Sequence, residues 1–174
     1  LWGLAKIGVR WPDLCRPSRS QVQGPLVSPM KDSILRFIKQ RVGGLRAHEY
    51  SVLIYSLACL EVSWTDLPFP VREKLIRRFL RVSGSLTSRD LATCVWGLGR
   101  LGVRREELSE EGWEELNRLV CSLVRDMKGK ELTQTVQGLG MMRVNWISLS
   151  SDTRESIFEA VNRSASSSFS LSLS

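Results

Sequence analysis

Four cationic side chains recur at helical spacing within one short segment: Lys74, Arg77, Arg78 and Arg81. The opposite face of the same helix would carry the apolar residues Leu75, Ile76, Phe79 and Leu80. An arginine side chain is planar and can hold a phosphate group through two parallel hydrogen bonds. A solvated face usually mixes both signs of charge, whereas Glu73 is the only acid beside these cations. We interpret this basic stripe as a phosphate-binding surface; a plain solvated face and a contact to an acidic protein surface remain alternatives.

Further cations stand near the ends of other predicted helices. His48, Arg89 and Lys130 each fall near a helix start, where free backbone N–H groups favour phosphate. Another set lies just after such helices: Arg10, Arg104, Arg105 and Arg143. Both sets could equally decorate exposed turns. We take eight residues as candidate contacts to a phosphate backbone: Lys74, Arg77, Arg78, Arg81, Arg89, Arg104, Arg105 and Lys130.

The net charge of +7 is unevenly distributed along the chain. Residues 70–105 contain nine Lys or Arg and two Asp or Glu, a net charge of +7. Residues 106–174 contain seven and eleven, a net charge of −4, and residues 1–69 contain nine and five, a net charge of +4. A basic region beside an acidic one gives the molecule a directed electrostatic field. This distribution suits one face on a nucleic acid and another on a basic protein.

The residue types that enzymes and metal sites need are missing or scattered. Six glutamates in residues 106–115 lack a His, Cys or glycine-rich partner, so we interpret them as a solvated acidic face. One histidine and four cysteines without a CxxC pair argue against zinc. No apolar run approaches the roughly 18 residues that span a bilayer. We predict no enzyme activity, cofactor, metal or membrane span. Cys59, Cys94 and Cys121 lie among apolar residues of predicted helices, and we interpret them as buried free thiols in a reducing compartment.

Four segments of the sequence align without gaps: LWGLAKIGVRW (1–11), IYSLACLEVSW (54–64), VWGLGRLGVRR (95–105) and VQGLGMMRVNW (136–146). Their starts are 53, 41 and 41 residues apart. Two positions are always small, which would let a neighbouring helix approach closely. One position is large in all four, and we predict that its tryptophans, Trp2 and Trp96, face the core. Three more tryptophans are predicted to pack between units, with stacking on bases as the alternative: Trp11, Trp64 and Trp146.

Each segment belongs to a helix with its own boundary signals. Thr87 and Ser88 are suitable N-caps, Asp90 suits the first turn, and Gly102 suits the position after the last turn. A second amphipathic helix is expected between segments, over 31–42, 70–82, 113–127 and 152–163. Helix pairs of about 41 residues stack into an α-solenoid, so we predict an all-α solenoid over residues 1–163.

Two stretches fall outside these helices. Residues 12–29 contain four prolines and one glycine and are predicted to form a long surface loop. Residues 164–174 are a Ser-rich tail that we predict to be disordered, although its alternating apolar residues leave a docked strand open. The predicted domain organisation is thus one helical segment followed by a short tail.

The third segment and its lead-in resemble octotricopeptide and heptatricopeptide repeats. Those repeats follow the pattern Ser/Thr-x-x-Asp/Glu-Leu-x-x-x-x-Trp-x-Leu-x-x-Leu-Gly. This chain fills the pattern with Thr87, Asp90, Leu91, Trp96, Leu98, Leu101 and Gly102. Threonine stands first, where serine is commoner. The resemblance covers most of residues 1–160 and is weakest at 127–146, where Gln137 replaces the aromatic residue.

The resemblance implies an organellar RNA-binding protein, similar to the RAP and FAST-kinase-like families, that acts in RNA stability, processing or translation. It implies localisation in the mitochondrion, or in another organelle such as a plastid. Some members of the family are built into mitochondrial ribosomes. We therefore predict a structural component of a mitochondrial ribosome whose cations contact rRNA beside neighbouring proteins. A protein–protein scaffold in a large organellar complex and a free organellar RNA factor are the alternatives.

Overall fold

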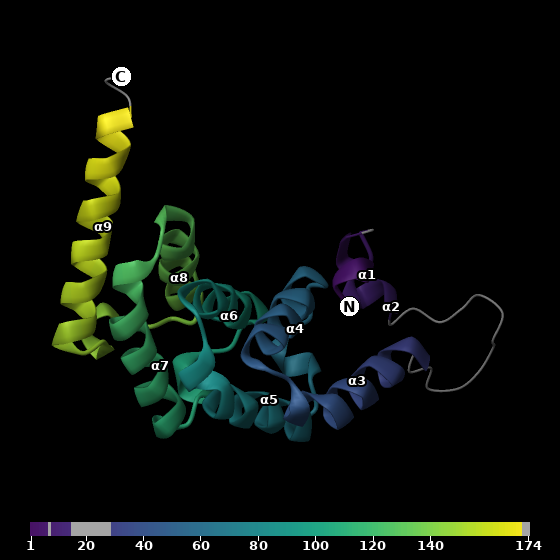
Figure 1. Cartoon of the computed structure of the whole chain (residues 1–174). Coiled ribbons are helices and arrows are strands. Elements are labelled where there is room, and N and C mark those ends of the chain that lie inside the picture. The colour runs from purple at the N-terminus through teal and green to yellow at the C-terminus, as the bar shows by residue number, and fades with distance from the viewer. Residues whose placement is uncertain (7, 15–28, 172–174) are drawn as a thin grey trace.

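The structure is a computed structural model that describes residues 1–6, 8–14 and 29–171. Within these ranges it is all-helical, with no strand (Figure 1). The α-helices are α1 (Trp2–Lys6), α2 (Trp11–Leu14), α3 (Pro29–Arg41), α4 (Ala47–Cys59), α5 (Phe69–Val82), α6 (Ser88–Leu101), α7 (Glu110–Leu123), α8 (Gly129–Met141) and α9 (Ser151–Leu171). Short 3-10 turns join them: η1 (Val42–Gly44), η2 (Trp64–Asp66), η3 (Ser83–Ser85), η4 (Arg105–Glu107), η5 (Val124–Asp126) and η6 (Trp146–Ser148).

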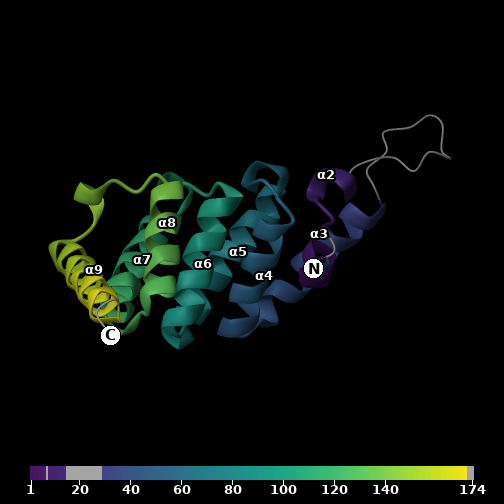
Figure 2. The same cartoon turned by 90° about the horizontal axis from the view of Figure 1, so that it is seen from above.

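The longer helices form two rows. The inner row holds α4, α6 and α8 side by side, with α6 packed between the other two and α1 beside α4 (Figure 2). The outer row holds α3, α5, α7 and α9, each packed against the next (Figure 1). A continuous apolar core fills the space between the rows, and its side chains include the fully buried Leu57, Leu75 and Leu98.

Glycines set the close approach of the inner helices. A Cβ atom added at Gly138 would lie 2.5 Å from the carbonyl carbon and oxygen of Val95. One added at Gly97 would lie 2.7 Å from the Cγ2 atom of Ile54. The small residues Gly97, Gly99 and Gly138 therefore lie where one inner helix meets the next, whereas Gly3 and Gly140 have nothing within 4 Å.

The predicted boundaries of α6 agree with the structure. Thr87 is the N-cap, its side chain accepts a hydrogen bond from the Asp90 backbone N–H, and the Asp90 carboxylate completes a capping box. Gly102 follows the helix with φ +85°, a left-handed conformation that glycine adopts without strain. The helix predicted over 113–127 begins earlier, at Glu110, because Ser109 caps the N–H of Gly112.

The predicted tail and loop differ from the structure in part. Residues 164–171 continue α9 instead of forming a disordered tail or a strand. Within this extension the Ser166 hydroxyl donates a hydrogen bond to the Asn162 carbonyl four residues earlier. Residues 12–14 belong to α2, and α3 begins at Pro29. The rest of the predicted loop, residues 15–28, and residues 172–174 lie outside the described residues.

The tryptophan prediction was wrong for Trp2, which is 48% exposed, and holds in part for Trp96, whose half-buried side chain packs against the core. Among the described residues, no other helix covers the side of the inner row on which these two rings are accessible. Trp11 and Trp64 are buried as predicted, whereas Trp146 is 49% exposed. Trp2, Tyr55 and Trp96 are therefore accessible at the surface of the inner row, whereas Tyr50 on α4 is fully buried in the core.

The cysteines that the structure describes are free thiols. Cys94 is buried, and desolvation together with the charge of Asp90 raises the pKa of its thiol. Cys59 and Cys121 are half-buried, which is less than we predicted, and Cys15 lies outside the described residues. A buried thiol with a raised pKa is unreactive, so Cys94 acts as a small apolar core residue.

Candidate nucleic-acid interface

One uncovered face of the inner row carries a regular set of side chains. On each helix they stand at positions i, i+4, i+7 and i+11, which form a single stripe on a helix. On α4 the stripe consists of His48, Val52, Tyr55 and Cys59. On α6 it consists of Arg89, Thr93, Trp96 and Arg100, and on α8 of Lys130, Gln134, Gln137 and Met141. All twelve side chains are exposed or half-buried, and we call this surface the inner-row face.

Two hollows open on the inner-row face. The first, of about 660 Å³, lies at the N-terminal ends of the helices, and its lining includes His48, the cations Arg89, Lys128 and Lys130, and the carboxylates of Asp90 and Glu131. The second, of about 740 Å³, lies at the C-terminal ends and includes Trp96, Arg100 and Gln137. The predicted cations of the helix starts are thus brought to one hollow, although they are 41 residues apart in sequence.

Aromatic rings connect the two hollows. Tyr55 lines the first hollow and Trp96 the second, and their ring centroids are 5.5 Å apart with 36° between the planes. Trp2 also lines the first hollow, and Lys6 places its Nζ atom 4.4 Å from the centre of that ring. A row of ring faces with cations at one end offers stacking partners for bases and charge for phosphates.

Asp90 fixes the N-terminal ends of α4 and α6 at the edge of the first hollow. Its Oδ1 atom accepts hydrogen bonds from His48 Nδ1 at 2.9 Å and Ser51 Oγ at 3.1 Å, and its Oδ2 atom accepts one from Thr87 Oγ1 at 2.7 Å. Burial raises the pKa of Asp90, but the hydrogen bonds from His48, Thr87 and Ser51 together bring it below the ordinary value. Asp90 is therefore an ionised carboxylate that orients His48 toward the hollow.

Replacing Asp90 by asparagine should reduce the free energy of unfolding by about 1–2 kcal/mol at neutral pH, because the amide has one accepting oxygen where the carboxylate has two, so either the bonds from His48 and Ser51 or those from Thr87 are lost. The contribution of Asp90 is fully present above the unfolded pKa, about 3.9, and is lost as the pH falls through the lower folded pKa. Urea unfolding between pH 2 and 7 measures this difference. The exposed Asp126→Asn is the control, and an equal loss in both variants would contradict this role for Asp90.

The basic stripe lies on the outer row, and three of its four side chains have a hydrogen-bond or ion-pair partner within the chain. Lys74 Nζ donates to the Lys39 carbonyl at 3.0 Å, and the Arg78 guanidinium donates to the Leu45 carbonyl. These carbonyls end α3 and η1, where cations are favoured by the helix dipole. Arg77 pairs with Glu73, an exposed pair of small energetic value. A hollow of about 200 Å³ is lined by all four side chains of the basic stripe. Among them, Arg81 is exposed and has no hydrogen-bond or ion-pair partner among the described residues.

Arg104 and Arg105 do not line either hollow of the inner-row face. Arg105 is half-buried, with its guanidinium 3.6 Å from Glu110 and 5.2 Å from the centre of the Trp113 ring. Its backbone N–H donates to the Met142 carbonyl, so it joins η4 to the end of α8. Arg104 is exposed on the adjacent turn. These two residues are therefore separate from the inner-row site.

Sequence reasoning missed Tyr55, Lys128, Gln134 and Gln137 as candidate site residues. One signal was present, because the large position of the fourth aligned segment is Gln137, a polar residue that a core position rarely accepts.

Within the described ranges, no group of three His, Cys, Asp or Glu side chains could hold a metal ion, and no helix has the length and apolarity to cross a membrane. No family model, curated protein or solved structure matches the chain.

Proposed function

We propose that this chain is an RNA-binding helical-repeat protein that holds single-stranded RNA along the inner-row face. The observation that carries the proposal is the shared placement of Trp2, Tyr55 and Trp96 with His48 and the cations Arg89 and Lys130. Stacking of a base on an aromatic ring contributes about 1–3 kcal/mol, and cations hold the phosphates between bases. Single strands suit this face because only unpaired bases can turn toward the rings.

The repeat architecture that we propose is an α-solenoid of helix pairs of about 41 residues. Its support is the offset of helix starts, since α4, α6 and α8 begin at Ala47, Ser88 and Gly129. The outer helices α5, α7 and α9 keep the same offset. A face built from successive similar helices extends along the rows, as a linear ligand such as RNA requires.

Direct binding tests the proposal. We expect a fluorescein-labelled single-stranded RNA to bind with an affinity that falls as salt rises. Replacing Arg89, Lys128 and Lys130 by glutamine should flatten the slope of log K against log salt by roughly 0.7 for each lost phosphate contact. The matched control replaces three exposed outer-row cations, Arg36, Arg77 and Arg81, by glutamine. If the control set changes the slope and the inner set does not, RNA binds the basic stripe instead.

The cellular setting that we propose is an organelle, with rRNA of a mitochondrial ribosome as the RNA. Its support is the resemblance of residues 86–105 to octotricopeptide and heptatricopeptide repeats. In a sucrose gradient of mitochondrial lysate, a ribosomal component should migrate with rRNA at moderate salt and be released by nuclease. Recovery in the light fractions without rRNA would contradict this and favour a free organellar RNA factor.

A scaffold role is the second candidate, and exposed apolar residues at one end of the rows favour it. Val136 on α8 is 43% exposed, whereas Val95, which stands 41 residues earlier, is fully buried. Val161 on α9 is 45% exposed, whereas Val120 is fully buried. Val136 and Val161 thus occupy repeat positions at which the preceding helices bury their valines. Exposed apolar side chains of this kind are typical of a surface that binds another protein. Retention of the chain in the large complex after nuclease treatment would support this candidate.

A further inference from the structure

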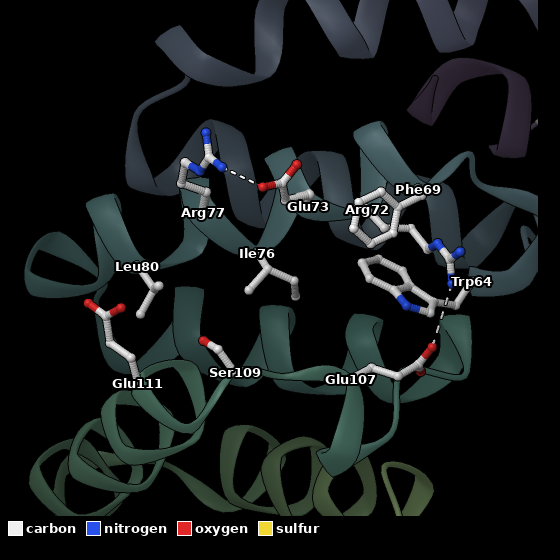
Figure 3. Close-up of a pocket in the computed structure, with 10 residues that line it drawn as sticks. All are labelled: Trp64, Phe69, Arg72, Glu73, Ile76, Arg77, Leu80, Glu107, Ser109 and Glu111. Atoms are coloured by element: carbon white, nitrogen blue, oxygen red, sulfur yellow. Dashed lines mark hydrogen bonds and ion pairs between the residues drawn. The ribbon is translucent and has the colours of Figure 1, made fainter.

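Another hollow, lined by apolar side chains and carboxylates, lies on the outer row between α5 and α7. It has a volume of about 450 Å³, and its floor is formed by Ile76 and Leu80 of α5 (Figure 3). Trp64 and Phe69 close one end of it, and the Phe69 side chain is 68% exposed. We call this hollow the outer groove. None of its lining residues belongs to the inner-row face.

The rim of the outer groove carries more negative than positive charge. Arg72 and Arg77 stand on it, but Arg72 lies 3.8 Å from Glu107 and Arg77 pairs with Glu73 (Figure 3). Glu111 has no hydrogen-bond or ion-pair partner among the described residues and is exposed on the α7 side. The rim therefore offers a ligand one unpaired negative charge, the Glu111 carboxylate, beside the apolar floor.

This combination of side chains on α5 is not repeated on the next outer helix, α7. The next outer helix carries Glu110, Asn117 and Cys121 at the positions 41 residues after Phe69, Ile76 and Leu80. A groove built on these residues would have a polar floor. The apolar floor between α5 and α7 is therefore a property of the side chains at this place and not of the helix packing.

We propose that the outer groove docks a segment of a partner protein that carries a large apolar side chain flanked by lysine or arginine. The apolar side chain fills the space above Ile76 and Leu80, which removes exposed apolar surface from water. The flanking cation lies against Glu111. An RNA strand is disfavoured here because its phosphates would meet Glu107 and Glu111. The RNA on the inner-row face and the protein segment in the outer groove can be bound together.

Selection from a displayed library of random twelve-residue peptides, with the whole chain as bait, tests this proposal. We expect the enriched peptides to combine Leu, Phe, Trp or Met with neighbouring Lys or Arg. Synthetic copies of these peptides should bind the Glu111→Lys and Phe69→Ser variants of the chain about tenfold more weakly than they bind the native chain. Such a loss is typical of removing one interface anchor. Both residues are exposed, so the fold should tolerate these changes, and circular dichroism checks that it does.

Matched controls separate docking from general surface effects. Glu114→Lys makes the same charge reversal one turn further along α7, and Phe37→Ser removes an exposed phenylalanine from α3. Neither residue lines the outer groove, so both variants should bind the peptides as the native chain does. The proposal is overturned if no peptide is enriched, if the enriched peptides are acidic, or if the controls lose as much affinity. It is also overturned if Phe69→Ser weakens RNA binding, which would make the groove part of the RNA site.

Discussion

Gly138→Ala should reduce the free energy of unfolding by about 3 kcal/mol, a large effect for one added methyl group. The new Cβ atom would lie 2.5 Å from the Val95 carbonyl group and 2.7 Å from the Trp96 backbone nitrogen. These are backbone atoms of α6, so no side chain can turn away to make room. The methyl group can be accommodated only if α6 and α8 move apart, and that movement opens the core beneath them.

Gly140→Ala provides the matched control two residues further along α8. A Cβ atom there has nothing within 4 Å, and alanine favours a helix over glycine by up to about 1 kcal/mol. We therefore expect Gly140→Ala to be neutral or stabilising. Urea unfolding followed by circular dichroism measures both variants. Equal stability of the two would show that the inner helices are not held at the distance described here.

Replacing both Tyr55 and Trp96 by alanine should weaken binding of single-stranded RNA by roughly a hundredfold, because each ring provides a face on which a base can stack. The two rings contact each other and are half-buried, so their outer faces are open to a ligand. Fluorescence anisotropy with a labelled RNA measures the loss. The slope of log K against log salt should stay nearly unchanged, since no cation is removed.

Trp146→Ala is the control for this double variant. Trp146 is 49% exposed in η6 and lines neither hollow of the inner-row face. We expect its loss to change RNA affinity by less than about twofold, within the usual range for a residue outside an interface. If Trp146→Ala weakens binding as much as the double variant does, the aromatic row does not define the RNA site.

The helix boundaries were predictable where their signals are local. The capping box of Thr87 and the left-handed Gly102 lie within a few residues of the helix ends that they define. The spacing of the small residues likewise predicted where helices approach. The exposure of Trp96 could not be predicted in the same way, because periodicity shows which residues share a face but not which face a neighbouring helix covers.

The candidate site was predictable only in part, for a related reason. His48, Arg89 and Lys130 were found from their positions at successive helix starts, and the structure places all three around one hollow. The partners of Lys74 and Arg78 are backbone carbonyls more than thirty residues away, and no side-chain pattern indicates them. These intrachain partners of the basic stripe, and the aromatic rings beside the inner-row cations, could be found only from the structure.

Cross-linking tests the central claim, that single-stranded RNA lies on the inner-row face, most directly. The chain would be bound to an RNA containing 4-thiouridine and irradiated, and the cross-linked peptides would be identified by mass spectrometry. The account predicts cross-links in the peptides that carry Tyr55, Trp96 and Gln137, on α4, α6 and α8. Cross-links confined to the outer helices α5 and α7, or none at saturating RNA, would contradict it.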